Sequence, residues 1–347
     1  MVQPSFVLDA IRVNRPLTHT DSPIRYRSLP IDVSICIANW NCVEMLHACL
    51  ESLLDQPQGV ELEVIVVDNA SSDGAADMVA RHYPEVTLIR NATNRGFARA
   101  NNQAAALARG RYLLFLNNDT VVPAGTLRGL VDFLEANPTV GMVGPCLRGS
   151  DGQPQISYRQ RPTLAALLHR TTLLRWTGLF RRAYYHYRRQ HFDPSTLRSV
   201  EALMGAAVVL PRDVFFACGQ WDEDFDFGGE DLDLSARVAK QHGVVFLPEV
   251  EITHYGRVSS RQNVNFATPG VAVGYVQYFR KHGYSPWLLT VYKLLVTLDA
   301  PLQCGVKLMQ ALWRLATGRP SKAYKSWLAA RGLLSLMATG LSRLWRA

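Results

Sequence analysis

Apolar runs alternate with segments of helical hydrophobic spacing through the first part of the chain. Four short apolar runs, typical of buried strands, are separated by helix-spaced segments of about a dozen residues. The predicted strands are residues 33–38, 62–67, 86–89 and 112–116. The predicted helices are residues 43–54, a segment that ends at Tyr83 and is capped by Ser71 or Ser72, and residues 97–108 and 125–137. This alternation predicts an α/β fold with a mainly parallel central sheet covered on both faces.

The pattern changes in the second half of the chain. The predicted elements there are a strand at residues 203–210, a turn-rich stretch at 219–229, a helix at 231–242 and a strand at 244–247. From Ser285 onward, apolar residues recur at helical spacing with basic residues between them. We therefore predict four regions. They are a proline-containing N-terminal extension (1–30), a first half of alternating strands and helices (31–145), a second half (146–283) and a basic amphipathic helical tail (284–347).

Polar residues gather where the predicted strands end. Asn39 and Asn41 follow the first strand, Asp68 and Asn69 the second, and residues 117–119 (Asn-Asn-Asp) the fourth. The carboxyl ends of parallel strands meet at one edge of a sheet, and ligands bind there. Each cluster alone is equally typical of a turn or a helix cap. Three such clusters at the same edge favour a binding site.

Several of these side chains suit specific chemistry. Asn118-Asp119 provides a carboxylate for Mg²⁺ or Mn²⁺, ions that proteins usually hold with one or two carboxylates plus substrate phosphates. Arg95-Gly96 opens a helix, where backbone can approach a ligand closely and anions are favoured. Each pattern also has a structural explanation, as a turn after a strand and as an ordinary helix start.

Two more groups complete the set of candidate residues. Glu230-Asp231 opens a helix and provides a general base for an acceptor hydroxyl, although acids at a helix N-terminus also suit its dipole. His254 follows a strand and is a potential metal ligand, although a lone histidine is more often structural.

The order of these clusters along the chain resembles that of the family 2 glycosyltransferases, and most closely their bacterial rhamnosyltransferase-like branch. The resemblance covers about residues 31–283. The motifs that carry it are Asn39-Trp40-Asn41, residues 67–74 (VDNASSDG), residues 94–98 (NRGFA) with Asn101-Asn102, residues 115–120 (FLNNDT), Phe225, residues 229–234 (GEDLDL) and His254.

The resemblance implies a fold of the GT-A type and an inverting, single-displacement transfer from a nucleotide-sugar donor. It implies that Asp68 contacts the nucleoside, that Asp119 holds a divalent metal (Mg or Mn) and that His254 lies by the metal or the diphosphate. Asp231 would be the catalytic base and Glu230 its neighbour. The sequence departs from the family's metal motif, which usually has two acids, because only Asp119 is charged here. The other residues expected to bind the donor are Asn39, Asn41, Asn69, Arg95, Gly96 and Asn118. The resemblance thus implies that residues 31–145 are the nucleotide-sugar-binding half and residues 146–283 the acceptor-binding and catalytic-base half.

Charge is distributed unevenly, although the net charge is only +8. After Asp299 the chain has eight lysines and arginines and no acid, and the stretch from Arg159 to Arg198 is basic with Asp193 as its only acid. Such segregation indicates anionic partners, whereas the alternative is a solvated basic face. We expect the tail to lie on the inner face of a cell membrane, and we expect no nucleic-acid partner.

Other features bound the cellular setting. The first thirty residues lack the pattern of a secretory signal, and no segment has the roughly 18 uninterrupted apolar residues of a membrane span. The six cysteines contain no CxxC pair, which indicates reduced, buried thiols. These features predict a cytoplasmic protein at the membrane periphery. The expected acceptor is a growing surface glycan or an acceptor linked to a polyprenyl diphosphate.

Two other interpretations compete with the enzyme. A non-catalytic nucleotide-sugar-binding subunit could share the fold, because fold alone does not establish chemistry. The presence of both Asp119 and Asp231 favours the enzyme, since a protein that only binds needs no base. A membrane scaffold would explain the tail but not the polar clusters. The donor stays open: rhamnose on dTDP follows from the branch resemblance, and UDP- and GDP-sugars are alternatives. The sequence does not define the oligomeric state.

Overall fold

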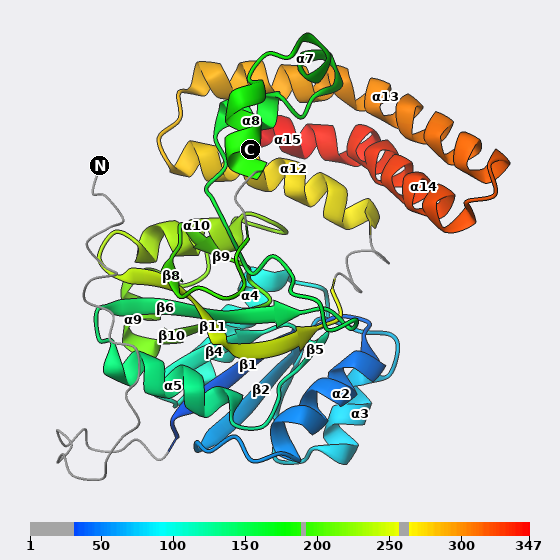
Figure 1. The fold of residues 1–347 in the computed structure, drawn as a ribbon. Helices are drawn as coiled ribbons and strands as arrows, with labels where there is room; N and C mark the ends of the chain where they lie inside the picture. The colour runs from blue at the N-terminus through cyan, green and yellow to red at the C-terminus, as the bar shows by residue number, and fades with distance from the viewer. Residues whose placement is uncertain (1–30, 189–191, 257–263) are drawn as a thin grey trace. The chain divides into compact units, whose positions relative to one another are not determined.

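The computed structural model describes residues 31–188, 192–256 and 264–347, so the predicted extension at 1–30 lies outside the described residues (Figure 1). The chain forms two compact units, each built from separate segments. The sheet unit takes the described part of Met1–Arg159 with Phe192–Glu223 and Asp231–Gly256. The helical unit takes the described parts of Gln160–His191, Asp224–Glu230 and Arg257–Ala347. The four functional regions predicted above stay a prediction.

The sheet unit is organised around one large sheet. Its strands are β1 (Val33–Asn39), β2 (Leu62–Asp68), β3 (Thr87–Arg90), β4 (Tyr112–Leu116), β5 (Thr120–Val121), β6 (Val140–Arg148), β8 (Arg198–Ser199), β10 (Ala207–Pro211) and β11 (Gly243–His254). They lie in the order β3-β2-β1-β4-β10-β6-β11-β5, with β8 beside β11. A separate small sheet pairs β7 (Tyr158–Arg159) with β9 (Ala202–Leu203).

Strand direction confirms the predicted fold class. The first four strands pair in parallel, and β6 pairs in parallel with β11. The strand β10 runs antiparallel to both β4 and β6, so it joins two parallel groups. Parallel pairing aligns the carboxyl ends of β1, β2 and β4 at one edge, where the polar clusters of the sequence lie.

Helices cover both faces of this sheet (Figure 1). One face packs against α2 (Val43–Leu54), α3 (Ala75–His82) and α5 (Thr126–Ala136). The other packs against α4 (Phe97–Leu107), α9 (Arg212–Ala217) and α10 (Glu230–Val238). In β1, Ile35 and Ile37 contribute to the first core and Cys36 to the second, as the two-residue period of a strand requires.

Two local predictions were wrong. Neither Ser71 nor Ser72 caps α3: the helix begins after Gly74, which has φ +85° and no side-chain cap, and the Asp73 carboxylate accepts from the Ala75 amide at 3.1 Å. The strand predicted at 203–210 is two strands, because β9 ends at Leu203 and β10 begins at Ala207. Periodicity cannot detect the break, since the residues between them are also apolar or small.

The helical unit has its own small core. Its helices are α6 (Leu164–Leu168), α7 (Thr172–Thr177), α8 (Arg181–Arg188), α12 (Val264–Lys281), α13 (Pro286–Ala316), α14 (Pro320–Ser335), the π-helix η1 (Leu336–Gly340) and α15 (Leu341–Arg346). The helices α13 and α14 lie side by side (Figure 1), and Ala300, Cys304, Ala330, Leu333 and Leu336 form a buried cluster. The predicted C-terminal helical extension is confirmed. Among the described residues, no helix combines the length and the apolarity that a membrane span requires.

A buried carboxylate ties two distant parts of the helical unit together. Asp299, on α13, is only 1% exposed. Its two oxygens accept from the backbone amide of Thr172, at the start of α7, at 2.8 and 2.9 Å. Gln303 donates to the same carboxylate at 2.5 Å. The acid that interrupts the apolar sequence of α13 therefore has a structural role, because it accepts from a backbone amide that would otherwise lack a hydrogen-bond partner.

The six cysteines are free thiols, and five of them are buried, as the sequence predicted. Large apolar side chains nevertheless remain exposed in the helical unit. They include Trp176, Leu179 and Phe180 around α7 and α8, and Leu294, Leu298, Leu302, Met309 and Leu312 on α13.

Candidate functional site

A buried asparagine joins the ends of three neighbouring strands. Asn39 closes β1 with its side chain fully buried. Its amide nitrogen donates to Asp68 Oδ1 at 3.0 Å and to Ser71 Oγ at 3.2 Å. Its amide oxygen accepts from Asn118 Nδ2 at 2.6 Å. Because β1 lies between β2 and β4, this one side chain reaches both neighbours and brings three of the predicted site residues together.

The two loops after β1 and β2 adopt backbone conformations that are uncommon for residues with side chains. Asn41 has φ 51° and Ala70 has φ 58°. Asparagine tolerates this left-handed region, whereas alanine adopts it at a cost. The loops are fastened to each other: the Asn41 amide donates to Ser71 Oγ at 2.9 Å, and the Asn41 side-chain oxygen accepts from the Ser72 amide at 2.8 Å. Such strain, held by a hydrogen-bond network, is frequent at ligand sites.

Asn69 links this network to the N-terminus of α4. Its side chain donates to the Gly96 carbonyl at 3.3 Å and accepts from the Arg95 amide at 3.4 Å. Gly96, with φ +83°, precedes the first residue of the helix. Asn91, which the sequence analysis did not single out, donates to Asn69 at 2.9 Å. The predicted residues Asn69, Arg95 and Gly96 therefore lie together.

The two predicted metal ligands face each other. Asp119 is 4% exposed, and its Oδ1 lies 3.4 Å from His254 Nε2. The pairing of β5 with β11 places them there, since Thr120 is opposite His254 in the antiparallel register. Below the same turn, the thiol of Cys49 lies 3.5 Å from Thr120 Oγ1. Burial raises the pKa of that thiol to about 12, so Cys49 stays protonated and is not a thiolate ligand.

A glutamine fixes the orientation of His254. Gln155 donates from Nε2 to the His254 carbonyl oxygen at 2.8 Å, and its Oε1 lies 3.0 Å from His254 Nδ1. A carbonyl oxygen can only accept, so the amide nitrogen must face it and the amide oxygen must face the ring. Nδ1 therefore carries a proton, and in the neutral ring Nε2 keeps a lone pair.

This donor set fits a divalent cation. The lone pair of His254 and the carboxylate of Asp119 offer two acceptor groups at one spot, and the side-chain nitrogen of Asn117 lies 3.5 Å from the same His254 Nε2. No group of three histidine, cysteine, aspartate or glutamate side chains that could hold a metal occurs among the described residues. A site with two protein ligands suits Mg²⁺ or Mn²⁺, which complete their coordination with phosphate oxygens and water.

The proposed base has a different set of contacts. Arg159, on β7, donates to Asp231 Oδ1. A methyl group in place of the Gly205 hydrogen would lie 3.4 Å from the Asp231 Cβ. The next residue, Ala206, accepts from the Asn117 amide at 2.9 Å. The break between β9 and β10 thus touches both Asp231 and the turn that carries Asp119.

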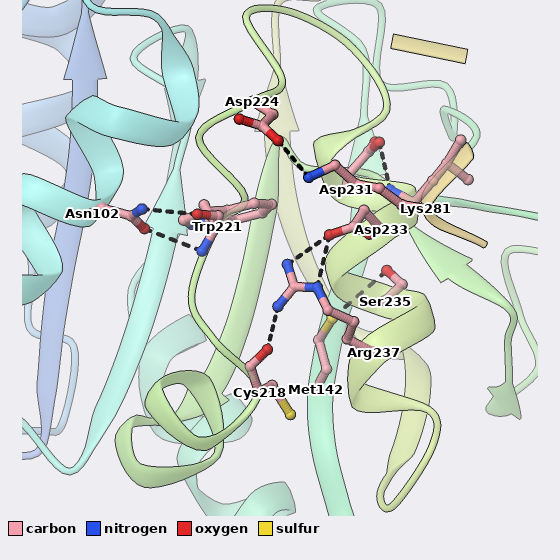
Figure 2. A network of polar contacts seen from close by, with 11 residues as sticks. Asn102, Met142, Cys218, Trp221, Asp224, Asp231, Asp233, Ser235, Arg237 and Lys281 are labelled. Carbon is pink, nitrogen blue, oxygen red and sulfur yellow. Dashed lines mark hydrogen bonds and ion pairs between the residues drawn. The ribbon is translucent and has the colours of Figure 1, made fainter. Parts of the chain in front are cut away.

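The helix that carries Asp231 is fixed by buried polar contacts (Figure 2). Asp233 pairs with Arg237 one turn later at 2.7 Å, and Arg237 also donates to the Cys218 carbonyl. Ser235 Oγ accepts from the Leu203 amide at 3.3 Å and donates to the sulfur of Met142 at 3.8 Å. Asp233 is therefore an internal ion-pair partner that holds the start of α10 in place.

Asn102 has a similar structural role. Its amide exchanges two hydrogen bonds with the backbone of Trp221, at 2.8 and 3.1 Å (Figure 2). The indole of Trp221 packs edge-on against Phe97 and Phe115. This asparagine, part of the motif noted in the sequence, thus anchors the segment that precedes the acidic turn.

The structure adds Gln155, Arg159 and Asn91 to the residues around the site. The sequence offered a weak indication of a role for Arg159, because this residue begins the basic stretch. It offered none for Gln155, since this glutamine reaches His254 across a separation of 99 residues. Glu230 begins α10, as predicted.

Comparisons with known proteins agree with this arrangement. The family model for glycosyl transferase family 2 matches residues 34–199. The N-acetylglucosaminyl-diphospho-decaprenol L-rhamnosyltransferase of Mycobacterium tuberculosis is 28% identical over 231 residues, which cover 61% of this chain and 71% of that protein. The UDP-Glc:alpha-D-GlcNAc-diphosphoundecaprenol beta-1,3-glucosyltransferase WfaP of Escherichia coli is 33% identical over 104 residues, which cover 30% of this chain and 41% of that protein.

The fold has solved relatives as well. The mannosyltransferase PcManGT from Pyrobaculum calidifontis, in complex with GDP-Man and Mn²⁺, superimposes with a TM-score of 0.50 at 22% identity. The match covers 90% of this chain and 87% of that one. This likeness supports the GT-A architecture. From the family 2 match over residues 34–199, the relatives and the polar edge of the sheet together, the chain is a glycosyltransferase similar to the rhamnosyltransferases of family 2.

Proposed function

We propose that this glycosyltransferase moves rhamnose from dTDP-rhamnose to a hydroxyl of a growing surface glycan carried on a polyprenyl diphosphate. The observation that carries the proposal is the pairing of Asp119 with His254 beside the Asn39 network, in a family 2 domain. Both curated relatives described above act, by their names, on a sugar linked through a diphosphate to a polyprenol, and one of them transfers L-rhamnose.

The donor would bind along the edge formed by β1, β2 and β4. Asp68 is the group for the nucleoside. Both of its oxygens already accept one hydrogen bond, from Asn39 and from the Ser71 amide, and each carboxylate oxygen can accept another. Asn41, Asn69 and Asn118 shape the same edge. The start of α4, at Arg95 and Gly96, suits the negative charge of a diphosphate.

Asp119 and His254 would hold the divalent metal. When bound, Mg²⁺ or Mn²⁺ neutralises charge that develops on the leaving diphosphate. The protein's contribution is the fixed geometry: Gln155 presents the lone pair of His254 toward the Asp119 carboxylate. The Mn²⁺ named with the mannosyltransferase complex supports this assignment by analogy of fold.

Asp231 would be the general base, with Glu230 beside it. It takes the proton of the acceptor hydroxyl while that oxygen forms its bond to the anomeric carbon and the bond to the diphosphate breaks. Displacement from the opposite side inverts the configuration. Arg159, which donates to Asp231, orients the carboxylate before the acceptor arrives.

The helical unit would place the enzyme on the inner face of the cell membrane. On α13, exposed apolar residues recur at helical spacing, at Leu294, Leu298, Leu302, Met309 and Leu312. The eight basic residues after Asp299 have no acid among them. Amphipathic helices with basic residues lie in the membrane interface, where a polyprenyl-linked acceptor is found.

The test is a donor screen with the purified full chain. We expect hydrolysis of dTDP-rhamnose, and its transfer to a short polyprenyl-diphosphate-linked N-acetylglucosamine, to depend on Mn²⁺ or Mg²⁺. UDP-glucose, UDP-galactose and GDP-mannose are the matched alternatives. Faster turnover of one of these would correct the donor. Failure to hydrolyse or transfer any of them, with a protein shown to be folded by circular dichroism, would contradict the proposed reaction.

A further inference from the structure

The end of α7 and the turn that joins it to α8 expose bulky apolar residues. Trp176 is 92% exposed, Leu179 is 51% exposed and Phe180 is 38% exposed. A tryptophan this exposed is unusual in a soluble domain, because its indole is among the largest apolar surfaces a side chain has. We call residues 174–182 the aromatic turn.

Hydrogen bonds fix the conformation of the aromatic turn, so its apolar side chains are held in their exposed positions. Gly178 ends α7 with φ +75° and donates to the Arg175 carbonyl at 3.3 Å. The ring of His169, itself buried, donates from Nδ1 to the Leu179 carbonyl at 2.6 Å. At the other end of α7, Thr172 is fastened to the buried carboxylate of Asp299.

The backbone conformation of Phe180 is a second sign that the exposure has a function. Its φ is 59°, a left-handed conformation that costs free energy for a bulky side chain and suits glycine or asparagine better. Phe180 also accepts from the Tyr184 amide at 3.0 Å and so begins α8. A strained phenylalanine at the tip of a fixed turn indicates that its exposed ring has a use.

Arginines surround these apolar residues. Arg175 precedes Trp176, and Arg181 and Arg182 follow Phe180; all three are exposed. From Arg159 to Phe192 the sequence has no acid at all. A second copy of the chain is a poor partner, because a symmetric contact through this turn would bring arginines toward arginines. A bilayer with anionic headgroups matches both features: aromatic rings sit at the headgroup level and arginines pair with phosphates.

We propose that the aromatic turn inserts into the interface of an anionic membrane, with Trp176, Leu179 and Phe180 at the boundary between headgroups and acyl chains and the arginines at the phosphates. The inference rests on the membrane location in the proposed function and adds a specific contact that the basic tail does not supply. The helical unit would then contact the membrane at two places, the aromatic turn and α13. The hydrogen bond from the Thr172 amide to Asp299 connects these two places within the protein.

The experiment measures binding of the full chain to vesicles of phosphatidylglycerol and phosphatidylethanolamine by co-sedimentation, with phosphatidylcholine vesicles for comparison. We expect Trp176→Ser with Leu179→Ser to weaken partitioning by roughly tenfold or more, and Arg181→Gln with Arg182→Gln by roughly fivefold per charge at low salt. The matched control is Leu107→Ser, which changes an equally exposed leucine (51%) of the sheet unit and should leave binding unchanged.

A second measurement follows the indole directly. Brominated lipids should quench wild-type fluorescence, and Trp176→Phe should remove a measurable part of that quenching while binding persists. Donor hydrolysis without vesicles should be unchanged in these variants, so vesicle binding and catalysis can fail separately. Wild-type binding by the Trp176→Ser/Leu179→Ser protein, or no binding of the wild type to anionic vesicles, would overturn the inference. So would concentration-dependent dimerisation that the same pair of substitutions abolishes.

Discussion

Gln155 and His254, 99 residues apart, are joined by two contacts that together leave one protonation pattern for the neutral imidazole ring. The glutamine amide cannot be reversed without placing its oxygen against the His254 carbonyl. This contact fixes the orientation of the His254 ring, so that the lone pair of Nε2 lies 3.4 Å from the Asp119 carboxylate. Second-layer partners of this kind orient metal ligands and raise their basicity.

Gln155→Ala should therefore weaken metal binding more than it weakens folding. We expect the affinity for Mn²⁺ in the presence of a nucleoside diphosphate to fall by about 10- to 100-fold, the usual range for such partners. Gln155→Glu should also lose affinity, because a carboxylate cannot donate to the His254 carbonyl. Calorimetry gives the affinity, and ¹⁵N spectra of the histidine ring report which nitrogen is protonated.

The control for this variant is Gln153→Ala, an exposed glutamine in the same loop. Its Mn²⁺ affinity should equal that of the wild type. If Gln155→Ala binds Mn²⁺ normally and keeps the proton on Nδ1, the glutamine does not position the histidine.

Asp119→Ala should weaken binding of the nucleotide sugar and remove any dependence of that binding on a divalent metal. The reason is that, within the described part of the chain, one carboxylate and one imidazole meet at this spot, so the loss of the carboxylate leaves a single ligand. Calorimetric titration of the donor with and without Mn²⁺ measures both effects. Metal-dependent affinity that persists in the variant would place the ion elsewhere.

Asp231→Asn should abolish transfer and leave donor binding nearly intact. The amide keeps the shape of the side chain and can still accept from Arg159, but it cannot take a proton from the acceptor. A general base contributes about 10²- to 10⁴-fold to a rate, which sets the expected loss in kcat. Transfer at the wild-type rate would shift the assignment to Glu230, and Glu230→Gln is the companion variant.

Asp299→Ala should destabilise the helical unit, because the Thr172 amide would lose its acceptor within a buried contact. The expected loss is about 1–3 kcal/mol in the free energy of unfolding. Asp299→Asn should lose less, since it retains one acceptor oxygen. Thermal unfolding followed by circular dichroism measures the change, with Thr290→Ala, an exposed position on the same helix, as the control. Equal stability of Asp299→Ala and wild type would refute the anchoring role.

The sequence predicted the parallel half of the sheet and the polar edge well. Short β-branched runs separated by helix-spaced segments have few alternatives, and the strand order then brings Asn39, Asp68 and Asn118 together. The order of the motifs also identified Asp119, Asp231 and His254. Their catalytic and binding roles remain predictions until the variants above are measured.

Other features depended on contacts between distant residues, which periodicity does not encode. Ser71 resembles a helix cap in the sequence, yet its hydroxyl accepts from Asn39 and Asn41, 32 and 30 residues away. The carboxylate of Asp299 looked like an interruption of an apolar helix, and its partner is 127 residues upstream. Arg159 lay in a basic stretch whose charge suggested a ligand, but its contact is Asp231.

The bond between Asp299 and Thr172 also imposes an order on folding during synthesis. The segment with Trp176 leaves the ribosome long before residue 299 is made, so the aromatic turn must wait without its anchor while the sheet-forming segments that follow it are translated. Domains generally fold as units, and a unit assembled from distant segments is slow to form because long loops must close first. The nascent chain should therefore expose an apolar segment for about a third of its synthesis, from Trp176 to residue 299. Chaperone binding to ribosome-stalled chains should peak after Trp176 emerges and fall once α13 is complete.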